Sequence, residues 1–327
     1  MKPREPDLIA TIRRAASSNP TLYLPLGIGD DAALFAAKPG HQTILTCDWF
    51  LEGSHFLRDK HPVDAVGWKC LARALSDVAA MGGEPRCFLL SLALPSSYRG
   101  RWLNEFLLGL RRAARKFKCP LVGGDTTRRR EILINVTVIG EVRVGCAMLR
   151  SGARPGDIIF VSGRLGEAEA GLRLLRGKGS ARIDKKDPTL RKHLYPEPRI
   201  ALGRHLSSGR IATAMMDLSD GLSSDLPRLC AASGVGARIA VAKLPAVDLT
   251  ARRGAKKADR LDLALDGGDD YELLFTVPSS KARRLPRTFQ GLPLTAIGEI
   301  TRKPRLTLVH SDGREETLRS GGWDPFR

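Results

Sequence analysis

The segment that decides the fold is Ile211-Ala212-Thr213-Ala214-Met215-Met216-Asp217-Leu218-Ser219-Asp220-Gly221-Leu222. An apolar run of strand length comes first, an acidic turn follows, and a helical pattern then continues to Ala232. The first half of the chain has the same order, with Thr43–Cys47 as a strand that delivers Asp48 at its end, and Val63–Met81 as a helix. Strands that alternate with helices in both halves predict two α/β or α+β domains.

Acidic turns flanked by glycine recur four times along the chain. One such turn says little, because Asp bonds its own backbone and Gly supplies positive φ in ordinary turns. Four together are different, since gathered carboxylates repel one another unless a cation joins them. Mg²⁺ takes oxygen ligands and often holds substrate phosphates, which glycine lets backbone N–H groups approach. The pattern predicts a Mg-nucleotide site built from Gly27–Asp31, Gly123–Thr127, Asp217–Gly221 and Gly267–Asp270.

Length and composition predict a globular protein of two domains. A chain of 327 residues exceeds one typical core, and 43% hydrophobic residues is ordinary. The longest apolar run, Cys87–Leu94, suits a buried strand and is too short to span a membrane. No stretch of signal-peptide type follows the N-terminus, so we expect a cytoplasmic protein. The best linker is Ser151–Asp157, which gives domains of residues 1–148 and 149–327.

The formal net charge of +18 raises the alternative of a non-catalytic nucleic-acid binder. Basic residues are spread along the chain, however, and aromatic residues make up only 6% of it, so no stacking platform for bases is indicated. A solvated basic surface is the preferred interpretation, and nucleic acid is not an expected partner. The six cysteines contain no C-x-x-C pair, which argues against a zinc site and a disulfide framework.

The sequence motifs of several classes of phosphate-binding protein are absent from this chain. The chain has no Walker A sequence, no G-x-G-x-x-G and no kinase H-R-D and D-F-G set. P-loop enzymes, protein kinases and ordinary dinucleotide-binding proteins are therefore excluded.

Seven motifs in order resemble bacterial thiamine-monophosphate kinase. They run along most of the chain, from residue 27 to residue 273, and together are far more specific than any one of them: Gly27–Ala33, Asp48 with Glu52–Phe56, Leu75–Gly82, Gly123–Thr127, Arg150–Asp157, Asp217–Leu222 and Gly268–Leu273. The resemblance implies the fold shared with aminoimidazole ribonucleotide synthetase. That fold has an N-terminal sheet domain that binds ATP and Mg²⁺, a C-terminal α/β domain that completes the substrate site, and a homodimer built on the N-terminal sheets. It also implies the reaction of ATP with thiamine phosphate to give ADP and thiamine diphosphate.

The resemblance also implies roles for individual residues. The metal positions are Asp31, Thr46, Cys47 through its backbone carbonyl, Asp48, Asp77, Asp125, Asp217 and Asp220. The ATP positions are Gly124, Asp125, Arg150 and Ser219, and the substrate positions are His55, Asp269 and Trp323. No residue forms a covalent intermediate, because an anionic phosphate oxygen attacks directly and the protein's task is positioning and charge stabilisation by several Mg²⁺ ions.

Three positions depart from the usual family pattern. Asp269 replaces a Glu and is one methylene shorter, Trp323 replaces a smaller aromatic, and Cys47 stands where a hydroxyl residue is common. Two alternatives stay open: another ATP-dependent enzyme of the same superfamily, and a degenerate relative that binds nucleotide without turnover, which Cys47 and Asp269 suggest.

Overall fold

The computed structural model describes residues 5–16, 21–28, 32–177, 186–248, 257–324 and 326. The described chain divides into two compact units. The boundary falls between residues 145 and 146, and residues 79–82 belong with the second unit.

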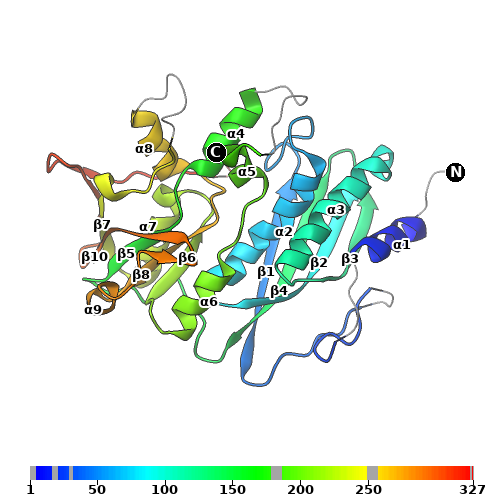
Figure 1. Ribbon diagram of the computed structural model, residues 1–327, viewed down its shortest axis with the longest axis horizontal. Coiled ribbons are helices and arrows are strands. Elements are labelled where there is room, and N and C mark those ends of the chain that lie inside the picture. Colours follow the sequence, from blue (N-terminus) through cyan, green and yellow to red (C-terminus); the bar gives the residue numbers. More distant parts are fainter. Residues whose placement is uncertain are drawn as a thin grey trace. The chain divides into compact units, whose positions relative to one another are not determined.

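The first unit is a four-stranded sheet in the order β1-β4-β2-β3, with helices packed over one face (Figure 1). β4 pairs antiparallel with β1 and β2, whereas β2 and β3 are parallel. α3 packs inward through Leu103, Phe106, Leu107 and Leu110, an i, i+3, i+4, i+7 spacing that places them on one side of a helix. The elements are α1 (Glu5–Ala16), β1 (His41–Leu51), α2 (Val63–Ala80), β2 (Glu84–Leu94), η1 (Ser96–Tyr98), α3 (Arg101–Lys116), β3 (Leu121–Arg128) and β4 (Leu133–Arg143).

The second unit is a larger mixed sheet in the order β12-β11-β7-β10-β5-β8-β6, with β9 beside β10. Its strands are β5 (Ile158–Ser162), β6 (Ala214–Leu218), β7 (Gly236–Ala240), β8 (Glu272–Val277), β9 (Thr288–Phe289), β10 (Leu292–Thr301), β11 (Leu306–Val309) and β12 (Glu315–Thr317). Its helices are α4 (Glu167–Gly177), α5 (Pro188–Leu194), α6 (Ile200–Ser208), α7 (Leu222–Ser233), η3 (Val241–Lys243), α8 (Lys257–Asp266) and α9 (Ser279–Ala282).

Both faces of the second sheet are buried around β8. All six residues of β8 are buried, because side chains alternate between the two faces and each face has its own helix. Ile159 packs in the cluster that contains α7, whereas its neighbour Phe160 packs in the cluster that contains α6. The two α/β units confirm the fold class predicted from the sequence.

Two predicted boundaries are wrong in ways that matter for the site. Asp48 lies inside β1 and not at its end, because β1 continues to Leu51 in register with β4. Gly123–Thr127 was expected to be a turn but lies in β3, paired with β2. The glycines and Asp that suggested a turn are accommodated because β3 is an edge strand.

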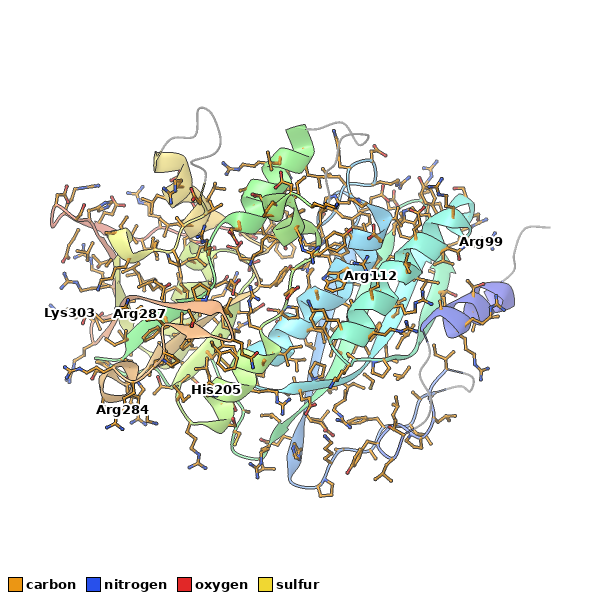
Figure 2. The ribbon with its side chains drawn as sticks, in the orientation of Figure 1. Arg99, Arg112, His205, Arg284, Arg287 and Lys303 are labelled. Atoms are coloured by element: carbon orange, nitrogen blue, oxygen red, sulfur yellow. The ribbon has the colours of Figure 1, made fainter. Side chains whose placement is uncertain are left out.

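Many of the basic side chains point outward from the ribbon (Figure 2). Arg284, Arg287 and Lys303 of the second unit are exposed examples. No described helix is both long enough and apolar enough to cross a membrane.

Candidate functional site

The first group of candidate residues lies on β1 and α2. Thr46 and Asp48 are two residues apart on a strand, so their side chains share one face of the sheet. The hydroxyl of Thr46 donates a short hydrogen bond to Oδ2 of Asp77, which lies near the C-terminal end of α2. Three predicted metal positions therefore lie on the α2 side of the sheet, and two of them are in direct contact.

The side chain of Cys47 lies on the other face. The amide of Asn135 on β4 donates to its Sγ at 3.1 Å, and Sγ lies 3.3 Å from Oδ1 of the same residue. The thiol is therefore directed away from Asp77. Sequence reasoning missed Asn135, because it is a single amide in a largely apolar stretch and belongs to no motif. Its burial in β4 is visible only in the structure.

Gly124 and Asp125 lie on β3, next to β2. Gly124 has φ of +149°, and a Cβ there would lie 1.9 Å from the carbonyl oxygen of Leu90. Only glycine fits such a close approach of two strands. The next residue, Asp125, pairs with Ser91 and has an exposed side chain.

A pocket of about 1120 Å³ opens beside this part of β3. Its walls come from α1, residues 24–28 and 32–35, and strands β2, β3 and β4, and its polar lining includes Ser91, Gly124, Asp125, Thr126 and Thr137. Within the described part of the chain, the buried hydroxyl of Thr126 has no hydrogen-bond partner.

In the second unit, the carboxylate of Asp225 binds the backbone of the segment Asp217–Gly221. Oδ2 of Asp225 accepts hydrogen bonds from the backbone N–H groups of Ser219 at 3.1 Å and Asp220 at 3.0 Å. Burial, together with the nearby charge of Asp220, raises the pKa of Asp225 to about 6. Arg228 bridges the two carboxylates, at 2.5 Å from Asp220 and 2.8 Å from Asp225.

Two further segments meet the same loop. The N–H of Asp269 donates to the carbonyl of Ser219 at 2.8 Å, and the N–H of Trp323 donates to the carbonyl of Asp220 at 2.9 Å. Asp217 is buried near the end of β6, two residues before Ser219. The structure therefore brings together five of the residues that the sequence selected: Asp217, Ser219, Asp220, Asp269 and Trp323.

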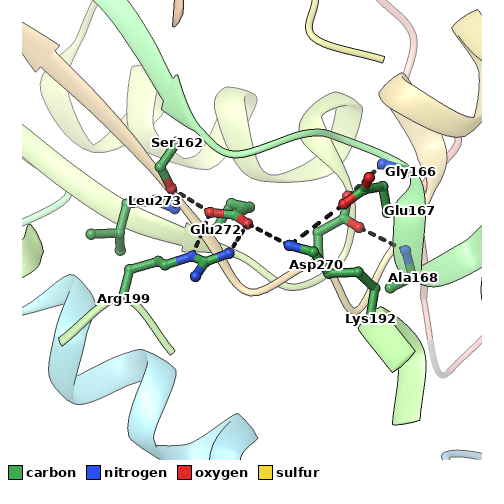
Figure 3. A network of polar contacts seen from close by, with 9 residues as sticks. All are labelled: Ser162, Gly166, Glu167, Ala168, Lys192, Arg199, Asp270, Glu272 and Leu273. Atoms are coloured by element: carbon green, nitrogen blue, oxygen red, sulfur yellow. Dashed lines mark hydrogen bonds and ion pairs between the residues drawn. The ribbon is translucent and has the colours of Figure 1, made fainter. Parts of the chain in front are cut away.

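Directly after Asp269, a buried carboxylate caps a helix. Asp270 accepts hydrogen bonds from the N–H groups of Gly166 at 2.5 Å and Ala168 at 3.0 Å, at the start of α4 (Figure 3). Such bonds satisfy N–H groups that a helix start leaves without intrahelical partners. Burial raises the pKa of Asp270 to about 7 in spite of these two bonds.

Glu272, at the start of β8, is fully buried in an ionic network (Figure 3). Arg199 grips both of its oxygens, Ser162 donates to Oε2 at 2.6 Å, and Nζ of Lys192 lies 3.4 Å from Oε1. Burial opposes the charged carboxylate, but the guanidinium of Arg199 and the ammonium of Lys192 outweigh it and lower the pKa of Glu272. Sequence reasoning missed Arg199 and Lys192, because they lie in a charged segment that carried no motif.

Arg150 and His55 make other contacts. Arg150 has an exposed side chain, and its carbonyl accepts from the hydroxyl of Ser233 at 3.0 Å. His55 lies in the turn after β1, where its Nδ1 accepts the N–H of Leu51 at 3.0 Å. Asp31 lies outside the described residues. Among the residues that are described, no group of three or more His, Cys, Asp or Glu side chains has an arrangement able to hold a metal ion.

Both halves of the chain match family models. Residues 29–142 match the N-terminal domain of the AIR synthase related proteins, and residues 154–311 match their C-terminal domain. The thiamine-monophosphate kinase of Escherichia coli K12 is 39% identical over 309 residues, which cover 93% of each chain.

Solved structures agree with the sequence comparison. The thiamine-monophosphate kinase of Stenotrophomonas maltophilia superposes with a TM-score of 0.81 at 36% identity, covering 94% of this chain and 96% of its own. A structure described as AaThiL complexed with AMPPCP and TMP gives 0.78 at 34% identity, covering 98% of this chain and 97% of its own. The chain therefore belongs to the thiamine-monophosphate kinase family of phosphotransferases, within the AIR synthase related proteins.

Proposed function

We propose that this protein transfers the γ-phosphoryl group of ATP to thiamine monophosphate, forming thiamine diphosphate and ADP. The observation that carries the proposal is the meeting of Ser219, Asp220, Asp269 and Trp323 around one loop of the second unit. A relative of 34% identity that was solved with AMPPCP and TMP supports the choice of both substrates.

The chemistry needs no covalent intermediate and no strong base. The attacking atom is a phosphate oxygen of thiamine monophosphate, which is already anionic near neutral pH. The barrier lies in bringing two anions together in line, so orientation and charge stabilisation carry the catalysis. Exclusion of water from the loops around the acceptor would favour transfer over hydrolysis.

Several Mg²⁺ ions would supply the charge neutralisation that phosphoryl transfer requires. The proposed ligands are Asp31, Thr46, the backbone carbonyl of Cys47, Asp48, Asp77, Asp125, Asp217 and Asp220. These are all oxygen donors, which Mg²⁺ prefers. The contact between Thr46 and Asp77 and the placement of Asp48 on the same face of β1 support the fit.

We assign ATP to Gly124, Asp125, Arg150 and Ser219. The pocket beside β3, whose lining includes Ser91 and Thr137, supports polar binding next to Gly124 and Asp125. Ser219 precedes α7 by three residues, and the N-terminus of a helix favours an anion. Arg150 would offer a planar pair of donors to phosphate.

We assign thiamine phosphate to His55, Asp269 and Trp323. The acceptor carries a cationic thiazolium ring and a flat pyrimidine, which suit a carboxylate and an aromatic face. The side chain of Trp323 is 46% exposed and that of Asp269 is 28% exposed, so both remain accessible to a ligand.

We further propose an N-terminal ATP and Mg²⁺ domain of residues 1–148, a substrate-completing domain of residues 149–327, and a homodimer formed through the first sheet. On β1, Leu45 is 71% exposed and Trp49 is 54% exposed. Large apolar side chains exposed on the face of β1 opposite to Thr46 and Asp48 favour coverage by a second copy. We expect the reaction to occur in the cytoplasm, where ATP is supplied.

The test is ³¹P NMR of the purified protein with Mg-ATP, with and without thiamine monophosphate. We expect thiamine diphosphate and ADP to form together, and only when both protein and acceptor are present. A folded protein that binds ATP but forms no thiamine diphosphate would overturn the proposal in favour of a sibling substrate or a degenerate relative.

A further inference from the structure

Two segments without acidic residues pack together in the second unit. Residues 198–216 and 273–298 contain no Asp and no Glu. The first segment includes α6, and the second includes α9 and β9. They meet in one hydrophobic cluster, which contains Leu206 of α6 and against which Leu285 and Phe289 are packed. Basic residues that look evenly spread along the sequence are therefore gathered here by the fold.

The exposed cations of this surface, which we call the α6–α9 patch, are Arg210, Lys281, Arg283, Arg284 and Arg287. Nζ of Lys281 donates to the carbonyl oxygen of Arg210 at 2.6 Å, which joins the end of α6 to α9. Arg284 and Arg287 follow α9 and are labelled in Figure 2. Cations gathered in this way attract an anionic partner.

The arginines of the patch are not neutralised by the protein itself. Within the part of the chain that the structure describes, none of them forms an ion pair. The carboxylate of Asp157 approaches Thr213, shortly after Arg210, but it is buried and accepts the hydroxyl of Thr213 at 2.6 Å. Exposed arginines elsewhere in the unit do have carboxylate partners, in the pairs Arg173–Glu169 at 2.9 Å, Arg238–Glu315 at 2.6 Å and Arg314–Glu316 at 2.9 Å.

Arg210 occupies a backbone position where glycine is usual. α6 ends in a Schellman motif, in which the N–H of Arg210 donates to the carbonyl of Ser207 and the N–H of Ile211 donates to that of Leu206, both at 2.9 Å. The φ of Arg210 is +48°, the left-handed conformation that this position requires and that non-glycine residues rarely adopt. The chain therefore carries a cation at a position where glycine would fit more easily.

A stacked pair of rings lies on the same two segments. The ring centroids of His205 on α6 and Phe289 on β9 are 4.9 Å apart, with 27° between the ring planes. His205 is exposed, whereas Phe289 is half-buried and packs against the core. A nucleobase that stacks on the exposed imidazole would extend this pair, since every base has a π-face. Nothing in the sequence marks the pair, because its members lie far apart in the chain.

We propose that the α6–α9 patch binds single-stranded nucleic acid, with its arginines on the phosphates and His205 stacked on a base. The planar guanidinium of arginine matches the geometry of a phosphate. A single strand fits better than a duplex, because only unpaired bases offer a free face for stacking. An acidic protein or an anionic membrane would use the charges of the patch but not its exposed ring.

The patch is separate from the candidate substrate loop. β6 runs from one to the other, since Arg210 precedes its first residue and Ser219 follows its last. β8 is antiparallel to β6, so it begins after Asp270 and ends before α9. The five residues of β6 span roughly 15 Å. Binding at the patch is therefore a further activity, independent of phosphoryl transfer at the loop.

The test is fluorescence anisotropy of a labelled oligouridine titrated with the full-length protein at several salt concentrations. One variant combines Arg283→Gln, Arg284→Gln and Arg287→Gln. We expect its affinity to fall by about tenfold or more. The slope of log affinity against log salt should become shallower by about 2, because each phosphate contact on a single strand contributes about 0.7. The same titration with oligothymidine assigns the strand as RNA or DNA, whichever binds more tightly.

The matched control combines Arg173→Gln, Arg238→Gln and Arg314→Gln, which removes the same charge from ion-paired arginines of the same unit. It should keep the affinity of the unchanged protein. Equal losses in the two triple variants would overturn the inference, because binding would then follow net charge alone. Turnover of ATP with thiamine monophosphate should be the same in both variants as in the unchanged protein, and its loss in the patch variant alone would overturn the separation of the two sites.

The stacking interaction is tested at His205. His205→Ala should weaken oligouridine binding by about fivefold or more, the scale of one base–aromatic stack, and His205→Phe should restore it. An unchanged affinity in His205→Ala would remove the ring from the site and with it the choice of nucleic acid. Tighter binding of polyglutamate, or of vesicles that contain anionic lipid, than of oligouridine would likewise overturn the inference, in favour of an acidic protein or a membrane surface.

Discussion

The acids of the two units are supported in different ways. In the first unit, Asp48 and Asp125 project from regular strands and are half-buried or exposed. In the second unit, Asp220 and Asp269 lie on loops, and each has a buried carboxylate close by in sequence. Asp225 holds the backbone beside Asp220, and Asp270 ties the loop of Asp269 to α4. The difference suggests that loops need internal anchors to place an acid, whereas strands place it by their own regularity.

The largest effect should come from the strand-borne acids. We expect Asp48→Asn or Asp125→Asn to reduce Mg-dependent turnover by at least about a hundredfold, the scale seen when one preorganised charge-stabilising group is lost. Stability should hardly change, because neither residue is fully buried. Turnover with Mg-ATP and thermal unfolding by circular dichroism measure the two quantities.

The matched control is Asp312→Asn, a substitution at an exposed residue, which should leave turnover unchanged. Near-normal rates in both Asp48→Asn and Asp125→Asn would remove these residues from the metal assignment. A large loss of stability with the loss of activity would contradict the comparison, because it would make strand-borne acids structural as well.

The second effect concerns the buried ion pair at the start of β8. Glu272→Gln leaves the largely buried guanidinium of Arg199 without the negative charge that it pairs with, and breaking a buried ion pair costs about 3–5 kcal/mol of the free energy of unfolding. The surface pair Arg101–Glu105, at 2.8 Å with side chains 92% and 40% exposed, is the control. Glu105→Gln should change stability by no more than about 0.5 kcal/mol. Urea unfolding compares the two, and equal values would refute a special role for the buried network.

The third effect tests the packing that brings α5 to the loop. Gly171→Ala should destabilise the protein by about 1–3 kcal/mol, because the new Cβ overlaps the backbone of α5. Gly177→Ala, at the other end of α4, has nothing within 4 Å of the added carbon. That control should be neutral or stabilise by about 0.4–1 kcal/mol. Equal changes in the free energy of unfolding at the two positions would contradict the prediction, because they would show that α5 accommodates the new Cβ without cost.

The helices and strands could be predicted from the sequence better than the buried side chains that hold the loops and strands in place. Periodicity located α2, β5 and β8 within a few residues, because their apolar faces are local and regular. It misplaced Gly123–Thr127 as a turn, because glycine and aspartate look alike in a turn and in an edge strand.

The residues of the candidate site could likewise be predicted only in part. The motif acids could be named because several of them stand next to glycine or a hydroxyl residue in one short stretch. Arg199 and His193 could not, since they reach Glu272 and Asp269 from segments more than 70 residues away in the chain. Their role depends on which helix packs against which strand, and one sequence carries no local mark of that.

The last effect is a pH dependence located at Asp270, and it is gradual, because it is spread over about three pH units. Burial raises the pKa of Asp270 to about 7, above the ordinary value for Asp, so the native state binds its proton more tightly than the unfolded chain does. The stability from this group is therefore complete at low pH and is lost as the pH rises from about 4 to about 7, with a slope of at most about 1.4 kcal/mol per pH unit. Asp270→Asn keeps an acceptor for the N-terminus of α4 but cannot titrate. Urea unfolding at pH 5, 6, 7 and 8 should show the unchanged protein losing stability relative to Asp270→Asn up to about pH 7 and then running parallel to it. A constant difference over this range would mean that Asp270 is ionised throughout, and that the loop of Asp269 is anchored by a charge in the same way as Glu272 anchors β8.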